Sequence, residues 1–142
     1  MKSMMFWLVI PLLLVQCKSQ QTPRHVVDVE NMHWKLVEVS GKTVSTPEGG
    51  REVYMVLSRE GDTRKLVGYA GCNGLGGDYA IDGSTIKFQP ITTRMHCQLQ
   101  MEVENTFTQM LSRADSFRIH DNILELYADK ELLGKFEAQP GR

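Results

Sequence analysis

The most reactive side chains of this 142-residue sequence belong to its three cysteines, Cys17, Cys72 and Cys97. Cysteine thiols form disulfides outside the cytoplasm, and as thiolates they attack substrates or bind metals. His96 directly precedes Cys97, so one hypothesis is a metal site made of Cys72, His96 and Cys97. Adjacent residues of an extended chain point in different directions, and no Cys-x-x-Cys spacing is present, so the pattern favours neither zinc nor a catalytic redox pair.

The first 16 residues have the pattern of an export signal. Lys2 precedes an apolar run at 4–15, which is shorter than the roughly 20 residues that a membrane-spanning helix needs. Cys17 follows Leu14-Val15-Gln16 directly, and this arrangement resembles a bacterial lipobox, where the cysteine receives a lipid and the chain is cleaved before it. The resemblance implies a lipoprotein with the signal peptide 1–16 and lipidation at Cys17. The alternative is a plain signal peptide followed by an incidental cysteine.

Residues 17–31 are expected to be the lipidated cysteine and a flexible tether, because 18–25 are polar and lack periodicity. Two or three acyl chains hold a protein firmly at a membrane. An Asp directly after the lipidated cysteine resembles an inner-membrane retention signal. This sequence has Lys18 at that position, so the expected location is the outer membrane of a Gram-negative bacterium. Cys72 and Cys97 would then remain as one pair, which predicts a disulfide in an oxidising compartment. Closing a loop of about 25 residues would contribute roughly 3 to 4 kcal/mol.

Composition argues against several function classes. Lys and Arg total 16 against 17 for Asp and Glu, so no positive excess exists to bind nucleic acid. The glycine-rich stretch 71–77 leads into a strand pattern instead of the helix that a phosphate loop needs. No Gly-x-Ser-x-Gly motif is present. We therefore predict no catalytic residues, no cofactor and no metal, and expect a monomer.

The elements that position these residues are mostly short strands. Alternating apolar residues and turn residues predict about eight strands, at 34–39, 52–58, 65–69, 78–81, 85–89, 117–120, 123–128 and 132–137. Asp82-Gly83 predicts a two-residue hairpin loop with positive φ at both residues. Apolar residues at helical spacing predict one amphipathic helix over 98–114, where Glu102 and Glu104 suit the helix dipole. The predicted fold class is α+β, a small antiparallel sheet or barrel-like domain with one packed helix.

Several spaced motifs carry a family resemblance. They are Trp34-x-Leu36, Gly68-Tyr69-Ala70-Gly71-Cys72-Asn73, Gly77-Asp78-Tyr79, Thr92-Thr93-Arg94-Met95-His96-Cys97 and Leu124-x-Leu126. Together they resemble the META domain, or HslJ-like, family of small exported bacterial proteins, many of which are lipoproteins. The resemblance implies a domain at 32–138, a tail at 139–142, an envelope location and, in some relatives, a link to heat shock or antibiotic tolerance. It implies no catalytic residues.

The polar segment before the helix is the candidate binding surface. A disulfide would hold it beside the Gly-Cys-Asn turn, and loops fixed on a rigid scaffold commonly bind partners. The candidate residues are Asn73, Thr92, Thr93, Arg94 and His96. The alternative is that they only satisfy backbone groups at the helix entry.

These observations predict a non-enzymatic envelope lipoprotein that acts as a binding or stress-protective module. It would contact the membrane through its lipid, and an unknown envelope protein or small ligand through its domain. Two alternatives stay open: a metal-dependent sensor or enzyme that uses Cys72, His96 and Cys97, and an inhibitor of an envelope hydrolase.

Overall fold

The computed structural model describes residues 28–95, 97 and 100–140. The predicted signal peptide, Cys17 and His96 lie outside the described residues. Within the described residues, one helix and nine strands follow one another in the order β1 (His33–Val39), β2 (Lys42–Thr43), β3 (Tyr54–Glu60), β4 (Thr63–Tyr69), β5 (Gly74–Asp82), β6 (Thr85–Thr92), α1 (Met101–Arg113), β7 (Ser116–His120), β8 (Ile123–Ala128) and β9 (Glu131–Ala138). The predicted α+β class with one helix is confirmed.

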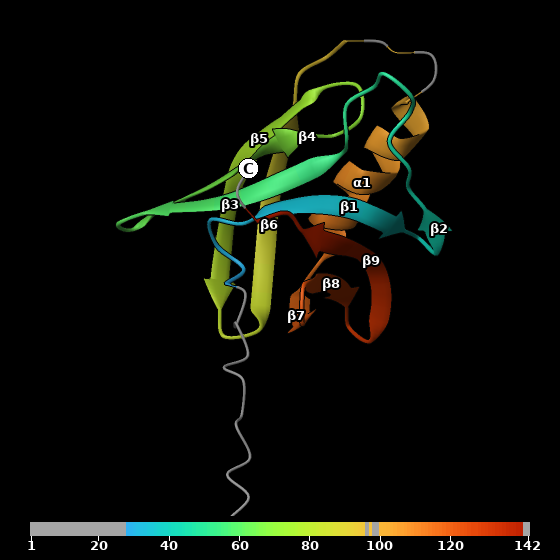
Figure 1. The fold of residues 1–142 in the computed structure, drawn as a ribbon. Coiled ribbons are helices and arrows are strands. Elements are labelled where there is room, and N and C mark those ends of the chain that lie inside the picture. The colour runs from blue at the N-terminus through green and yellow to red at the C-terminus, as the bar shows by residue number, and fades with distance from the viewer. Residues whose placement is uncertain (1–27, 96, 98–99, 141–142) are drawn as a thin grey trace, which may run out of the picture.

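The strands form one antiparallel sheet that curls into a ring (Figure 1). Their order is β2-β1-β3-β4-β5-β6-β7-β8-β9, and an additional pairing of β1 with β9 joins the two sides. The pairing of β6 with β7 is confined to Thr85 and Ser116. The ring is therefore barrel-like without being a regular barrel, because a closed barrel needs continuous ladders between all neighbours.

Strands β5 and β6 extend furthest beyond their predicted bounds, and β2 was not predicted. β5 begins at Gly74 instead of 78, and β6 continues through Pro90 to Thr92. The glycines of β5 pair with β4 and β6 through their backbones, which an alternation of side chains cannot reveal. Gly77 has φ +136, and a Cβ there would lie 2.1 Å from the carbonyl oxygen of Gln89. Only glycine fits this position.

The hairpin between β5 and β6 is present, but its loop is shifted by one residue from the prediction. Asp82 pairs with Thr85, so the two loop residues are Gly83 and Ser84. Gly83 has φ 57, whereas Asp82 is an ordinary strand residue. A glycine at the first loop position is typical of a type II′ turn. The buried residues Ile86 and Phe88 set this register, because a slip of one residue would turn them toward solvent.

The core lies between the inward faces of the strands and the apolar face of α1. Phe107 of the helix packs against Phe136 of β9, with ring centroids 5.9 Å apart. Trp34 is fully buried, and its indole N–H donates to the Val29 carbonyl oxygen at 2.9 Å. Within the part of the chain that the structure describes, no helix is long and apolar enough to cross a membrane.

Candidate functional site

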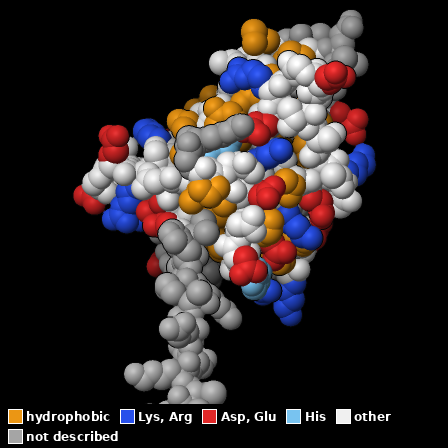
Figure 2. Space-filling view, in the orientation of Figure 1, with side chains coloured by type: hydrophobic (Ala, Val, Ile, Leu, Met, Phe, Trp, Pro, Cys, Tyr) orange, Lys and Arg blue, Asp and Glu red, His pale blue; other side chains and the backbone are white. Residues whose placement is uncertain are grey.

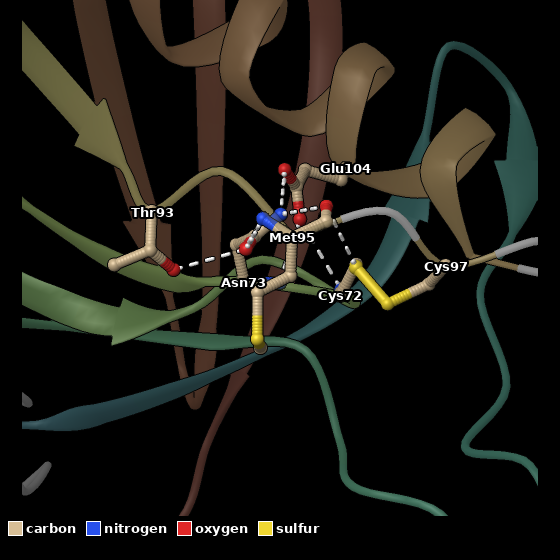
Figure 3. The surroundings of a disulfide bond; sticks show 6 residues. All are labelled: Cys72, Asn73, Thr93, Met95, Cys97 and Glu104. Atoms are coloured by element: carbon tan, nitrogen blue, oxygen red, sulfur yellow. Dashed lines mark hydrogen bonds between the residues drawn. A yellow bond between two sulfur atoms is a disulfide. The ribbon is translucent and has the colours of Figure 1, made fainter.

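A disulfide joins Cys72, in the loop after β4, to Cys97, ahead of α1 (Figure 3). The two Cα atoms are 5.8 Å apart, as disulfide geometry requires. The predicted pairing is confirmed. Both sulfur atoms are bonded to each other in this state, so neither is a thiolate that could ligate a metal. Among the described residues, no group of three or more His, Cys, Asp or Glu side chains could hold a metal ion.

Asn73 connects this loop to the segment that follows β6. The residue is 1% exposed. The Oδ1 atom accepts hydrogen bonds from the Thr93 hydroxyl at 2.9 Å and from the Met95 N–H at 2.8 Å. The Nδ2 group donates to the Met95 carbonyl oxygen at 3.1 Å. Asn73 therefore holds segment 93–95 from its buried side and is not part of the exposed surface.

Glu104 of α1 completes the arrangement from the helix side. This residue is only 4% exposed. Its Oε2 accepts the backbone N–H groups of Cys72 and Asn73 at 3.2 and 2.7 Å, and its Oε1 accepts from Asn73 Nδ2 at 2.8 Å. One buried carboxylate thus satisfies three donors of the loop. We call the set Cys72, Asn73, Thr93, Met95, Cys97 and Glu104 the disulfide network (Figure 3).

The role of Glu104 was missed by the sequence interpretation, which assigned it to the helix dipole. The missed signal is its spacing: it precedes Phe107 by three residues and Leu111 by seven, so it lies on the apolar face. Glu102 lies on a different side of α1, exposed, with its carboxylate 3.3 Å from Lys42 Nζ. A glutamate at an apolar-face position predicts a buried carboxylate that needs internal donors.

The candidate binding residues occupy different environments. Thr92 is half-buried at the end of β6, whereas Thr93 and Arg94 are exposed. The Thr93 N–H donates to the Gly74 carbonyl oxygen at 3.3 Å, which continues the pairing with β5. Met95 is 62% exposed. The structure therefore brings Thr93 and Asn73 together and presents 93–95 on a supported loop.

A second polar cluster surrounds Glu30, which the sequence interpretation did not single out. Its carboxylate accepts from the Tyr79 hydroxyl at 2.7 Å and from Arg64 Nε at 3.2 Å, and Arg59 lies 3.6 Å away. The Tyr79 hydrogen bond and the two guanidinium groups hold the pKa of Glu30 below its ordinary value, against the effect of burial. Burial and the adjacent Glu30 raise the pKa of Tyr79. We call Glu30, Arg59, Arg64 and Tyr79 the Glu30 cluster.

Apolar side chains gather over the region of β4 and β5 in Figure 2, and exposed apolar residues lie on β4 and β6. Val67 and Ile91 are 46% and 69% exposed, and they stand on either side of Gly76 in one register row. Where β1 pairs with β3, His33 stacks on Tyr54 with 4.2 Å between ring centroids. The His33 ring also lies 3.0 Å from the Glu52 carboxylate. These contacts are on the opposite face of the sheet from the core.

Comparisons with known proteins agree with this architecture. The family model described as the META domain matches residues 27–140. A solved structure described as "NMR structure of the protein from Burkholderia xenovorans" has a similar fold, with 21% identity, a TM-score of 0.62 and coverage of 79% of this chain and 84% of that one. A second NMR structure has 21% identity, a TM-score of 0.59 and coverage of 78% and 94%. A search of curated proteins finds no match.

Proposed function

The chain belongs to the META domain family, and we propose that it is a non-enzymatic lipoprotein of the cell envelope. Its disulfide-stabilised domain would act as a binding or stress-protective module, held by the lipid on Cys17 at the outer membrane. The carrying observation is the bond between Cys72 and Cys97. Because the sequence has three cysteines, this bond leaves Cys17 for the lipid, at the end of the apolar run.

The construction of the disulfide network supports a binding role. Three hydrogen bonds of the side chain of the buried Asn73, together with a disulfide, position the loop that presents Thr93, Arg94 and Met95 to solvent. A loop held in one conformation before binding loses less conformational entropy when a partner arrives. The proposed partner is an envelope protein or a small ligand, contacted at this loop.

Cell fractionation of the full chain in a Gram-negative host tests the anchor. Wild type is expected in the membrane fraction, and Cys17→Ser is expected in the soluble periplasmic fraction. The matched control is the double variant Cys72→Ser/Cys97→Ser, which removes two other cysteines and should stay in the membrane fraction. Retention of Cys17→Ser in membranes would contradict the lipid anchor.

Intact mass of the exported Cys17→Ser chain tests the disulfide-bonded, metal-free state. Purified without reductant or chelator, the protein should be two hydrogens lighter than its reduced form and carry no adduct. Stoichiometric zinc together with intact thiols would instead support the metal-dependent sensor or enzyme. His96 would then be the first residue to substitute.

A further inference from the structure

The large apolar side chains that the described residues expose to solvent gather in one part of the molecule. They are Val67, Ile91 and Met95, which are 46%, 69% and 62% exposed. Val67 and Ile91 flank Gly76 in one register row of β4, β5 and β6, on the face of the sheet that points away from the core. Met95 follows Ile91 by four residues, just beyond the end of β6. An exposed apolar patch bordered by polar residues marks an interaction site for a protein or a membrane.

Two arginines border this patch at one end. Tyr69 lies on the same outward face of β4, because alternate strand residues share a face. The Arg51 guanidinium lies over the Tyr69 ring, with its central carbon 4.2 Å from the ring centroid. Gly74 pairs with Tyr69 and accepts a hydrogen bond from the Thr93 N–H. Arg94, the next residue, therefore lies across Gly74 from the ring that carries Arg51.

The positive charges of these arginines are not neutralised within the described part of the chain. Neither Arg51 nor Arg94 forms an ion pair with a described residue, and both are exposed. The acidic side chains nearby already have basic partners: Asp78 Oδ1 lies 2.6 Å from Lys65 Nζ, and Glu52 contacts a histidine and a lysine. Guanidinium N–H groups match the geometry of phosphate oxygens. The border of the patch is therefore suited to an anionic partner.

We propose that this part of the molecule docks on the surface of a bilayer that contains anionic phospholipid. The apolar side chains would enter the boundary between headgroups and acyl chains, and the two guanidinium groups would bind headgroup phosphates. Surface binding of this kind adds buried apolar area to electrostatic attraction by anionic lipid, and this surface offers both. A tyrosine is also well suited to the interface, because its ring is apolar and its hydroxyl is polar. We call the following residues the lipid face: Arg51, Val67, Tyr69, Ile91, Arg94 and Met95.

The inference rests on the proposed function and deepens it. The small ligand of the loop at 93–95 becomes an anionic phospholipid, met at the surface of the membrane that holds the lipid anchor. A lipid is favoured over a protein partner because the lipid face combines apolar side chains with positive charges that lack acidic partners among the described residues, and anionic phospholipid is complementary to both.

The proposed anchor brings the lipid face within reach of the bilayer. Ten residues, 18–27, separate Cys17 from Asp28, and a chain of this length spans at most about 34 Å. His33 of β1 lies in the same register row as Ile91, four strand spacings or about 19 Å away along the sheet. A tethered domain meets the bilayer at a high effective concentration, so contacts that are weak by themselves suffice to orient it.

Co-sedimentation with vesicles tests the lipid face. The protein is the mature chain without its lipid, residues 18–142, exported behind a cleavable signal peptide so that the disulfide forms. The probe is a vesicle of phosphatidylethanolamine and phosphatidylglycerol in equal parts. We expect binding that weakens as salt is added, because salt screens charges near a surface. Vesicles of phosphatidylcholine alone should bind much less protein, because they carry no net charge.

Charge variants locate the electrostatic contribution. Arg51→Gln and Arg94→Gln should each weaken binding to the anionic vesicles about fivefold, the equivalent of about 1 kcal/mol for one basic residue near an anionic surface. The matched control is the double variant Lys42→Gln/Lys130→Gln, which removes two positive charges from exposed positions outside the lipid face. It should change the affinity less than about twofold.

Apolar variants locate the hydrophobic contribution. Ile91→Ser/Met95→Ser should weaken vesicle binding about tenfold or more, because it removes the two most exposed apolar side chains of the lipid face. Ile91→Leu/Met95→Leu is the control, since it keeps the apolar surface, and it should bind as wild type does. Both side chains are exposed, so thermal unfolding should show the same melting temperature in every variant.

Photo-crosslinking in cells separates a lipid from a protein partner. A photoreactive side chain in place of Ile91, in the full chain with Cys17, should form adducts with phospholipid. Adducts with one envelope protein alone would overturn the proposal and make this surface a protein-docking site. Absent binding to anionic vesicles, equal binding to phosphatidylcholine, or an equal loss of affinity in the lysine control would overturn it as well.

Failure of the lipid anchor is measured separately. Washing membranes at high ionic strength releases protein that is held mainly by surface charges. Cys17→Ser that stays in the membrane fraction after this wash contradicts the lipid anchor and leaves the vesicle result intact. A negative vesicle result contradicts the lipid face and leaves the anchor intact.

Discussion

Two carboxylates stand near opposite ends of β4, and they are held by different physical means. Glu104 is buried and accepts hydrogen bonds only from neutral donors of the loop after β4. Glu30 faces two arginines, Arg59 and Arg64, whose side chains are partly exposed, together with the Tyr79 hydroxyl. If Glu104 is removed, its buried neutral donors have neither an acceptor nor water. If Glu30 is removed, the partly exposed guanidinium groups can bind water instead.

From this difference we expect the ion pairs of the Glu30 cluster to contribute less to the free energy of folding than the buried hydrogen bonds of Glu104. The Glu30 cluster should respond to salt and pH, because its charges are near the surface. The disulfide network should respond mainly to substitution and to reductant. The following predictions test this contrast, beginning with the largest expected effect.

Glu104→Ala is expected to have the largest effect. It leaves two backbone N–H groups and one amide N–H of the loop without their buried acceptor. The free energy of unfolding should fall by about 3 to 5 kcal/mol. Urea denaturation measures this loss. Glu102→Ala, at an exposed position of the same helix, should cost less than about 1 kcal/mol. Equal losses in the two variants would contradict the assigned role of Glu104.

Cleavage of the disulfide should have the next largest effect. Cys72→Ser/Cys97→Ser is expected to lower the free energy of unfolding by roughly 3 to 4 kcal/mol, because the unfolded chain is no longer constrained. Wild type in reductant should behave like this variant. Hydrogen exchange should become faster at Thr93 and Met95 while residues of the Glu30 cluster keep their protection. Uniformly faster exchange would show that the two regions are not independent.

Tyr79→Phe should have a moderate effect on the Glu30 cluster. Losing the hydroxyl removes a hydrogen bond to a carboxylate, and the free energy of unfolding should fall by about 1 to 2 kcal/mol. The pKa of Glu30 should rise, because the Tyr79 hydrogen bond is the largest cause of its lowering. NMR titration of the carboxyl carbon checks this. Tyr127→Phe, which removes a similar bond to Glu125, is the control and should leave Glu30 unchanged.

The pH dependence of stability should show the smallest effect. Because the folded pKa of Glu30 lies below its ordinary 4.5, its contribution is present above that value and is lost as pH falls through the folded pKa. The pKa of Tyr79 is raised, so its contribution is present below its ordinary value of 10.0 and is lost at higher pH. Thermal unfolding at a series of pH values measures the loss of stability at low pH and at high pH. Glu30→Gln should reduce the loss of stability at low pH, and an unchanged loss would contradict this account.

Local patterns in the sequence predicted most of the elements. The alternation of Leu124 and Leu126 and the helical spacing of Phe107 and Leu111 depend on which side of an element faces the core, and that periodicity is visible along the chain. The pairing of Cys72 with Cys97 followed from cysteine arithmetic once Cys17 was set aside. These features were predictable because few residues, or few alternatives, decide them.

Only the tertiary structure decided which distant groups meet. The sequence determined that Asn73 is in a turn and that Glu104 is in a helix, but their contact joins residues 31 positions apart. The inward position of Asn73, the start of β5 at Gly74 and the short pairing of β6 with β7 likewise depend on neighbours supplied by other strands. Backbone pairing and buried hydrogen bonds satisfy groups that every sequence contains, so side-chain patterns alone do not reveal their partners.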